Sequence, residues 1–182
     1  VVPTLIKVLS VCKNSSVCDG ALRVGTECLD GGNKIVQSEF LRVLTKSDSE
    51  GMFFYALRER IRGSSKALGL YREVREFNKG RAEEMIDGIR ESSKTQGLLT
   101  ELCEGHNLKM QNLIRDQTCN LKTFNLLEEN IELLSTQAKS LTVVRQFNLI
   151  EAETTLSSIT FLVEMVQGPC GENKTFICDS RK

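Results

Sequence analysis

Residues 97–115, with the sequence GLLTELCEGHNLKMQNLIR, carry the pattern that decides the fold class. Apolar side chains recur in this stretch at spacings of three and four residues, which places them along one face of an α-helix. They are Leu98, Leu99, Leu102, Cys103, Met110, Leu113 and Ile114. The stretch therefore predicts one helix over about 97–115 whose apolar face packs against a core.

A second apolar stripe predicts another long helix nearer the C-terminus. Its members are Val144, Phe147, Ile150, Ile159, Leu162, Val163 and Val166. Gly168 and Pro169 follow, and a helix does not continue through that pair. The only prolines are Pro3 and Pro169, so residues 4–168 lack the strongest helix breaker. Helices are therefore expected along most of the chain.

Upstream of these two helices the apolar spacing predicts shorter ones. Their expected ranges are 5–11, 18–29 and 35–44. Gly31 and Gly32 supply the turn after the second of them, and Asn33 supplies the N-cap of the third. These two helices should therefore form an antiparallel hairpin. The run Asp-Ser-Glu at 48–50 offers the N-cap of a further helix that should reach about Arg62.

Residues 63–97 break the pattern, because they are rich in charge, serine and glycine and carry weaker apolar stripes. We expect exposed helix with loops there, as a charged flexible insert between helices. No alternation of apolar and polar residues persists for five positions, so no strand is predicted. The expected fold is all-α, with helical hairpins stacked as an armadillo/HEAT-like solenoid segment in a single domain over 1–182.

The charge balance and the cysteines exclude several classes of protein. Lys+Arg and Asp+Glu both number 24, which gives no net charge and none of the basic surface that nucleic-acid binding requires. No apolar stretch approaches the ~18 residues that cross a bilayer, so no direct membrane insertion is expected. The seven cysteines lack paired C-x-x-C spacing and predict reduced thiols in a reducing compartment. Because the chain begins at Val1 without a signal sequence, we expect it to be part of a longer polypeptide.

Few residues of the chain could act as a catalytic nucleophile or base. His106 is the only histidine, and Cys103 lies three residues before it. A Cys–His hydrolase is therefore one alternative function, ranked below the two hypotheses given at the end of this section. Cys103 belongs to the apolar stripe, however, and a buried thiol is inert. Gly31 and Gly32 also lack the spacing of a phosphate-binding loop. We therefore expect no enzyme and no organic cofactor.

The remaining candidates are glutamates on the predicted helices. Most of them are expected to face solvent, namely Glu101, Glu128, Glu129, Glu132 and Glu172. Glu104 and Glu164 differ, because each stands next to an apolar stripe, beside Cys103 and Val163 respectively. They should therefore lie at the edge of a helix interface, where two carboxylates that meet could hold a hard cation.

The sequence then resembles one family of proteins. Residues 102–107 (LCEGHN), followed by Gln111, Asn112 and Arg115, resemble the LCENHN...QN(F/Y)LR segment of the inositol-trisphosphate and ryanodine receptors. These receptors are intracellular calcium-release channels. Residues 164–173 (EMVQGPCGEN) are similar to their TEY-x-QGPC-x-x-N.

A third stretch, residues 29–33 (LDGGN) with Gln37, is similar to the L-x-GGN...(I/V)Q of the same channels. The three motifs occur in the order that the family has. The chain departs from the family at Gly105, where the pattern has Asn, and at Met165, where it has Tyr. Residues 120–126 look more like the inositol-trisphosphate receptors than the ryanodine receptors, so we favour the former.

The resemblance implies a RIH-associated region, which is a cytosolic helical segment of a very large homotetrameric channel in the endoplasmic or sarcoplasmic reticulum membrane. Its expected partners are the C-terminal and neighbouring domains of the same channel. By resemblance, Glu104 and Glu164 are ligands of an activating calcium site with His106 and Gln167 close by, and a backbone carbonyl of the C-terminal domain completes the site. Because calcium prefers six to eight oxygens, this chain would carry half a site and bind calcium weakly. His106 should only orient a carboxylate, because imidazole suits softer metals.

A second function class stays open, in which the chain is a purely structural α-solenoid scaffold or interaction module with no ion site. The position of two carboxylates separates the hypotheses. A shared ion requires Glu104 and Glu164 to converge, whereas carboxylates that point apart favour the scaffold.

Overall fold

The computed structural model describes residues 1–48, 50–141 and 148–179, and all regular structure within these ranges is helical. The all-α prediction is therefore confirmed. In chain order the helices are α1 (Val2–Val11), α2 (Ser15–Leu29), α3 (Lys34–Ser47), α4 (Met52–Val74), α5 (Lys79–Cys103), α6 (Leu108–Arg115), α7 (Leu126–Leu141), α8 (Leu149–Val166) and α9 (Gly171–Asp179).

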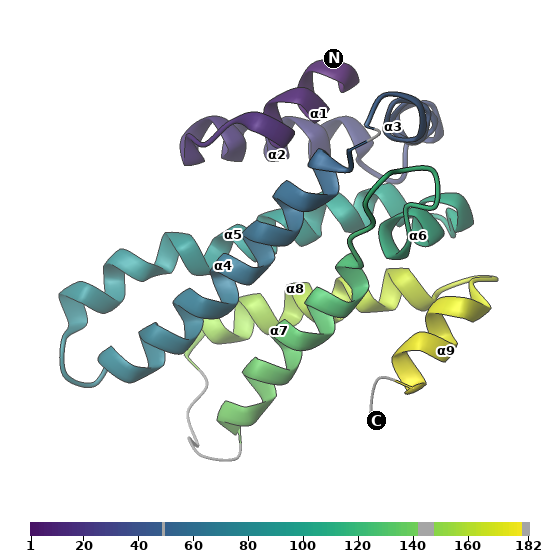
Figure 1. Ribbon diagram of the computed structural model, residues 1–182. Coiled ribbons are helices and arrows are strands. Elements are labelled where there is room, and N and C mark those ends of the chain that lie inside the picture. The colour runs from purple at the N-terminus through teal and green to yellow at the C-terminus, as the bar shows by residue number, and fades with distance from the viewer. Residues whose placement is uncertain (49, 142–147, 180–182) are drawn as a thin grey trace.

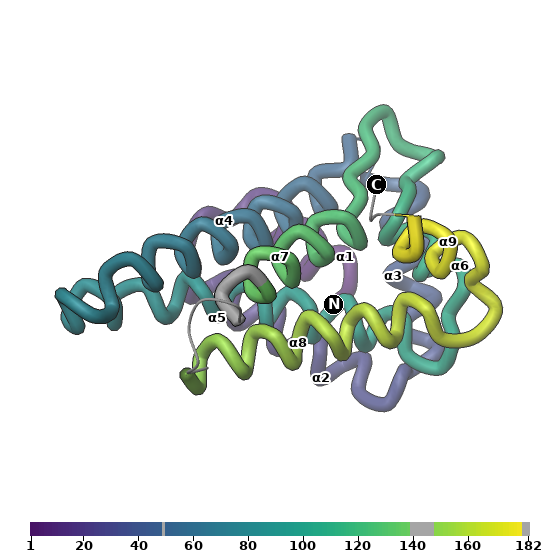
Figure 2. The backbone as a smooth tube through the Cα atoms, turned by 90° about the horizontal axis from the view of Figure 1, so that it is seen from below, coloured from purple at the N-terminus to yellow at the C-terminus, as the bar shows by residue number. Residues whose placement is uncertain are grey.

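Helix α5 is the centre of the arrangement, because it packs against helices on several sides. It pairs with α4, while α2 covers another part of it and α8 lies along a further side (Figure 1). Helix α7 packs on α4 and α8, and α1 packs on α2, α3 and α4. In the view from below, α6 and α9 lie together beside the C-terminal end of α8 (Figure 2). This stacking of helices is consistent with the predicted solenoid-like segment.

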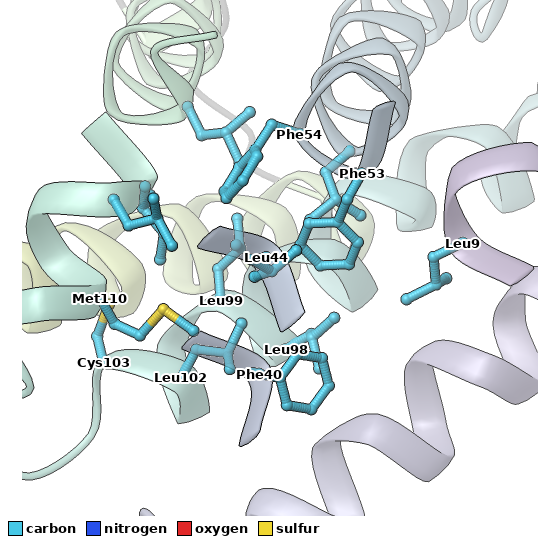
Figure 3. Packing of buried hydrophobic residues seen from close by; sticks show 14 of the residues in the cluster. Leu9, Phe40, Leu44, Phe53, Phe54, Leu98, Leu99, Leu102, Cys103 and Met110 are labelled. Carbon is cyan, nitrogen blue, oxygen red and sulfur yellow. The ribbon is translucent and has the colours of Figure 1, made fainter. Parts of the chain in front are cut away.

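The main core gathers where α3, α4 and α5 meet (Figure 3). Phe40, Phe53 and Phe54 are fully buried, and the rings of Phe53 and Phe54 pack edge to face with centroids 5.4 Å apart. Helix α5 contributes Leu98 and Leu99, which are also fully buried. Burying a side chain of this size contributes about 1.5–3 kcal/mol, so the cluster fixes how α5 sits among its neighbours.

The turn between α2 and α3 forms as predicted. Gly31 and Gly32 have φ values of 64° and 70°, a conformation that residues with a Cβ atom rarely adopt. The side-chain oxygen of Asn33 then accepts hydrogen bonds from the N–H groups of Ile35 and Val36 at 3.2 and 3.3 Å. These bonds cap α3 and start the second helix of the hairpin.

Helices α4 and α5 are longer than predicted. The Asp48 carboxylate accepts the N–H of Met52, where α4 begins, at 2.8 Å, whereas Ser49 of the predicted cap lies outside the described residues. Helix α4 does not end near Arg62 but continues to Val74, and α5 starts at Lys79. The prediction of loops within 63–97 was therefore wrong except for a short turn between the two helices.

Ion pairs account for part of the charge in residues 63–97, and a small core buries apolar side chains of the same stretch. Arg72 and Arg75 each bond the Glu151 carboxylate, at 2.7 and 2.8 Å, and only 2% of the Glu151 side chain is exposed. Leu68 and Ile89 are fully buried in a second, smaller core against α8. Helices α4 and α5 are thus stabilised by residues of α8, which lie far away in the sequence. A local sequence pattern does not reveal such contacts. The flexibility of the stretch stays a prediction.

The single helix predicted over 97–115 was wrong, because the structure has two helices there. Helix α5 ends at Cys103 and α6 begins at Leu108. Between them Gly105 and His106 have φ values of 70° and 60°, which an α-helix does not accommodate. The predicted apolar positions still face inward, because both helices pack into the main core.

The stripe predicted on the last long helix is only partly its buried face. Ile159 and Val163 are 45% and 44% exposed, whereas Ser158 and Phe161 of the same helix are fully buried. The buried face includes polar side chains that are hydrogen-bonded, since the Ser158 hydroxyl accepts a bond from Gln96 Nε2 of α5 at 2.9 Å. A pattern of apolar residues alone misses a buried face that contains hydroxyl groups.

Two members of that stripe, Val144 and Phe147, lie outside the described residues. Helix α8 ends at Val166, just before Gly168 and Pro169, which confirms the predicted end. No residue range was predicted for helices α7 and α9, although Glu128 and Glu172 were expected to lie on helices, as they do. None of the described helices combines the length and the apolar character that crossing a membrane requires.

Candidate metal centre

Glu104 and Glu164 lie at the C-terminal ends of two neighbouring helices. Glu104 caps the end of α5, and Glu164 lies in the last turn of α8. The two helices pack together and end on the same side of the molecule (Figure 1). The residues next to the two glutamates are in contact, with Cys103 Sγ and Met165 Sδ 3.7 Å apart. The fold therefore brings two glutamates from distant parts of the sequence to one corner.

Burial and like charge act on the Glu164 carboxylate. Glu164 is 8% exposed, and its Oε2 has no hydrogen-bond partner within the described part of the chain. Burial raises the pKa of Glu164 above its ordinary value, and the charges of Glu104 and Glu101 also raise it, while His106 lowers it. A buried carboxylate with negative neighbours is unfavourable without a counter-charge, so this corner favours a cation.

The two carboxylates alone would be an incomplete set of ligands for a metal ion. Across the ranges that the structure describes, no three side chains of His, Cys, Asp or Glu gather closely enough to hold a metal ion. Carboxylate oxygens are hard donors of the kind that calcium prefers, but calcium takes six to eight oxygens. The residues present therefore fit a hard cation in kind and supply only part of its coordination.

His106 and Gln167 lie at the same corner. Gln167 caps the end of α8, and Gly168 follows with a φ of 70°. A Cβ atom added at Gly168 would lie 2.7 Å from the Cβ of His106, so the turn after α5 and the turn after α8 are in direct contact. All four residues that the resemblance assigns, Glu104 and Glu164 included, thus lie within one small region of the molecule.

The turn between α2 and α3 packs directly on the end of α5. The Gln37 amide donates to the backbone oxygens of Glu101 and Glu104 at 2.9 and 3.0 Å. Lys34 Nζ donates to the same Glu104 oxygen at 3.0 Å. A Cβ atom at Gly32 would lie 2.8 Å from Glu104 Cγ, so this approach requires glycine. Two of the three sequence motifs therefore meet in space at Glu104.

Helices α6 and α9 hold the end of α8 in the same manner. Gln111 Nε2 donates to the backbone oxygens of Glu164 and Gln167 at 2.6 and 3.0 Å. Asn173 Nδ2 donates to the backbone oxygen of Met165 at 2.9 Å. Gln111 and Asn173 are both members of the sequence motifs. The motif residues thus hold the backbone that carries Glu164.

Glu101 belongs to this corner, although the sequence pattern predicted a solvated side chain. Its Oε2 is buried and has no hydrogen-bond partner among the described residues. Burial raises the pKa of Glu101, Glu104 and Asp30 add to the rise, and the N–H groups of Gly32 and Gly31 oppose it. The spacing of three residues from Glu104 is the signal in the sequence, because it places both glutamates on one helix face.

Cys103 has no catalytic environment. It is fully buried, and burial strongly raises the pKa of its thiol, with the charge of Glu164 acting in the same direction. The reactive thiolate is therefore not formed near neutral pH. The surroundings of Cys103 therefore give no support to a hydrolase built on Cys103 and His106.

A comparison with known families points to the same part of the chain. The family model described as RyR and IP3R Homology associated matches residues 89–182, from the second half of α5 through α9. The matched range includes Glu104, His106, Glu164 and Gln167, and the family is one of channel receptors rather than enzymes. The match does not separate the two receptor types, so the preference for inositol-trisphosphate receptors stays a prediction. Because the matched residues make up more than half of the chain, this protein belongs to the RyR and IP3R Homology associated family.

Proposed function

We propose that this chain is a regulatory and coupling segment of a ligand-gated intracellular calcium-release channel, and that it contributes half of an activating calcium site. Glu104 and Glu164 are the calcium ligands in this proposal, and His106 and Gln167 support them. The observation that carries it is the Glu164 carboxylate. This group is buried beside the charge of Glu104, and one of its oxygens has no hydrogen-bond partner in the described structure.

The chemistry of the corner supports calcium and a weak site. The backbone oxygens of Glu104, Glu164 and Gln167 already accept hydrogen bonds from the Gln37 and Gln111 amides. The carboxylates are therefore the ligands that we propose for an ion, because these backbone oxygens are already engaged in hydrogen bonds. The missing oxygens must come from water and from a partner, for which the family implies the C-terminal domain of the channel. Binding to this chain alone should be in the millimolar range.

Coupling follows if two domains share one ion. When both domains supply oxygens, they bind calcium more tightly than when the domains are separated. Calcium therefore increases the population of channels in which the two domains meet at the ion. Without a counter-charge, the repulsion between Glu104 and Glu164 disfavours bringing further oxygens to this corner. The differential affinity of the two arrangements sets how far gating can shift.

The proposed setting is the cytosolic face of the endoplasmic or sarcoplasmic reticulum membrane, within a homotetramer. The partners are the C-terminal and neighbouring domains of the same channel. Family membership supports a place in a larger receptor. The buried, negatively surrounded carboxylate supports the calcium site within it.

Calcium titration of the purified chain, followed by NMR chemical shifts, tests the site. We expect saturable binding in the millimolar range and its loss in Glu164→Gln. Glu153→Gln is the matched control, because Glu153 lies on the same helix, is 44% exposed in its side chain and pairs with Arg90 at 3.6 Å. Micromolar affinity of the chain alone contradicts the half site, and unchanged binding by Glu164→Gln contradicts the choice of ligands.

A scaffold without an ion site is the second candidate, and one surface favours it. Helix α8 carries a row of exposed apolar side chains, Leu149, Leu156, Ile159 and Val163, which are 73%, 66%, 45% and 44% exposed. Positions 149, 156 and 163 repeat every seven residues, a spacing that suits packing against a further helix. A neighbouring segment of the same channel would cover this row. The scaffold hypothesis predicts no saturable binding in the calcium titration.

A further inference from the structure

Two buried glutamines hold the candidate ligands in matching ways. Gln37 of α3 donates its amide to two backbone oxygens at the end of α5, one of them that of Glu104. Gln111 of α6 donates its amide to two backbone oxygens at the end of α8, one of them that of Glu164. Gln37 and Gln111 are 1% and 0% exposed. Each candidate ligand therefore has one buried amide bonded to its own main chain.

The ends of α5 and α8 need donors of this kind. The last four carbonyl groups of an α-helix have no partner within the helix. Glu104 and Gln167 leave the helical conformation, with ψ values of 139° and 150°, so the following chain turns away. The side-chain amides supply donors from other helices. They thereby fix the direction in which each helix end presents its glutamate.

We infer that Gln37 and Gln111 are positioning residues of the candidate calcium site, which fix the backbone of Glu104 and Glu164 without touching the ion. This inference rests on the function proposed above. Groups that orient metal ligands from outside are worth about 10–100-fold in metal affinity. The two amides are therefore expected to control affinity and not only stability.

The end of α5 has a second donor. Lys34 Nζ reaches the Glu104 backbone oxygen at 3.0 Å, beside the Gln37 amide. The side-chain oxygen of Gln37 is also satisfied, because Asn107 Nδ2 donates to it at 3.1 Å. Without Gln37, Glu104 is still partly held by Lys34.

The end of α8 depends more on one residue. Gln111 donates to the Glu164 oxygen at 2.6 Å, whereas Asn173 donates to the oxygen of the next residue, Met165, at 2.9 Å. The side-chain oxygen of Gln111 is buried and has no partner in the described part of the chain, so its bonds to α8 set the orientation of the amide. Replacing Gln111 should therefore have the larger effect.

The test replaces three buried glutamines by methionine, which keeps the size of the side chain and removes the amide. Terbium(III), a hard cation with luminescence, is the probe. We expect Gln111→Met to bind it about 10-fold more weakly or worse, and Gln37→Met to show a smaller loss. Gln96→Met is the matched control, because Gln96 is 1% exposed and bonds Ser158 between the same two helices, outside the corner. Its affinity should equal that of the unmodified chain even where its stability falls.

A second readout needs no metal. In the metal-free chain, the carbonyl carbon resonances of Glu164 and Gln167 report on the hydrogen bonds that these groups accept. Both should shift in Gln111→Met and stay in place in Gln96→Met. If Gln111→Met does not fold, Gln111→Asn retains a polar side chain that is one methylene shorter, and the same two measurements apply.

The positioning role and the calcium site fail in different ways. Equal terbium affinity of Gln111→Met and the unmodified chain overturns the positioning role and leaves the site standing. An equal loss in Gln96→Met also overturns it, because the effect is then general. If the unmodified chain does not bind terbium, or if Glu164→Gln binds terbium equally well, the result contradicts the calcium site. It then also contradicts the positioning role, which depends on that site.

Discussion

Two buried glutamates on α8 have opposite surroundings. Glu151, near the start of the helix, bonds Arg72 and Arg75 at 2.7 and 2.8 Å. Glu164, in the last turn, has a buried oxygen without a partner in the described structure and lies beside the charge of Glu104. Burial alone therefore does not separate a structural carboxylate from a candidate ligand. The sign of the neighbouring charges distinguishes the two glutamates, because arginines surround Glu151 and a glutamate lies beside Glu164.

The difference follows from which helix ends each glutamate faces. Glu151 meets the end of α4, which carries two arginines. Glu164 lies where α5 and α8 both end, and the C-terminal end of a helix carries about half a negative charge. Two such ends add to the repulsion among the carboxylates. The same features make the corner suitable for a cation.

The largest effect is expected from Glu151→Gln. This change leaves Arg72 and Arg75 without their buried counter-charge, and breaking a buried pair from one side costs about 3–5 kcal/mol. The free energy of unfolding in urea measures the loss. Glu153→Gln, at a half-exposed pair on the same helix, should change it by less than about 1 kcal/mol. A similarly small loss for Glu151→Gln would remove the distinction between the two ends.

A smaller loss is expected from Gly168→Ala, which forces apart the two turns of the candidate site. Gly168 has a φ of 70°, and an added Cβ would lie 2.7 Å from His106 Cβ. The conformation costs an L-residue about 1–2 kcal/mol, and the overlap adds to it. Thermal unfolding measures the effect against Gly171→Ala, where nothing lies within 4 Å. Equal stability of the two variants would show that the turns separate freely.

Glu164→Gln should behave in the opposite way to Glu151→Gln. Without calcium, the change removes a buried charge that has negative neighbours and one oxygen without a hydrogen-bond partner in the part of the chain that the structure describes. We expect the free energy of unfolding to stay the same or to rise by up to about 1 kcal/mol. Urea unfolding in the presence of a chelator checks this. A loss as large as that of Glu151→Gln would show that Glu164 has a structural partner.

The smallest effect is a dependence on pH. The pKa of Glu164 in the folded chain lies above its ordinary value of 4.5, so the folded chain holds this proton more tightly than the unfolded chain. The contribution of Glu164 to stability therefore falls as pH rises from 4.5 through the raised pKa. Compared with Glu164→Gln in metal-free buffer, the unmodified chain should lose stability over that range. A constant difference between the two would contradict the raised pKa.

Part of the candidate site could be predicted from the sequence. The motifs identify Glu104, His106, Glu164 and Gln167, and the structure places all four at one corner. Glu101 was missed, because the composition of a helix face does not show whether another segment covers it. The turn between α2 and α3 covers it here.

The helix break at 104–107 shows the same limit. Gly105 is visible in the sequence, but one glycine inside an apolar periodicity does not decide whether a helix ends. The positive φ of His106 accompanies its contact with Gly168, and that contact exists only once α8 has packed on α5. The break therefore combines local features, Gly105 and the Asn107 N-cap of α6, with a packing contact that the apolar pattern does not show.

The sequence by itself determined that the chain is helical, that Asn33 caps a helix and that three motifs follow one family's order. The first two properties depend on residues within one or two helical turns of each other, and the third is an order of residues along the chain, which needs no folded structure. Only the tertiary structure decided that Glu151 pairs with arginines while Glu164 Oε2 has no hydrogen-bond partner among the described residues, and which face of α8 is buried. The partners that decide these points lie on other helices, so their charge and packing act only after the chain has folded.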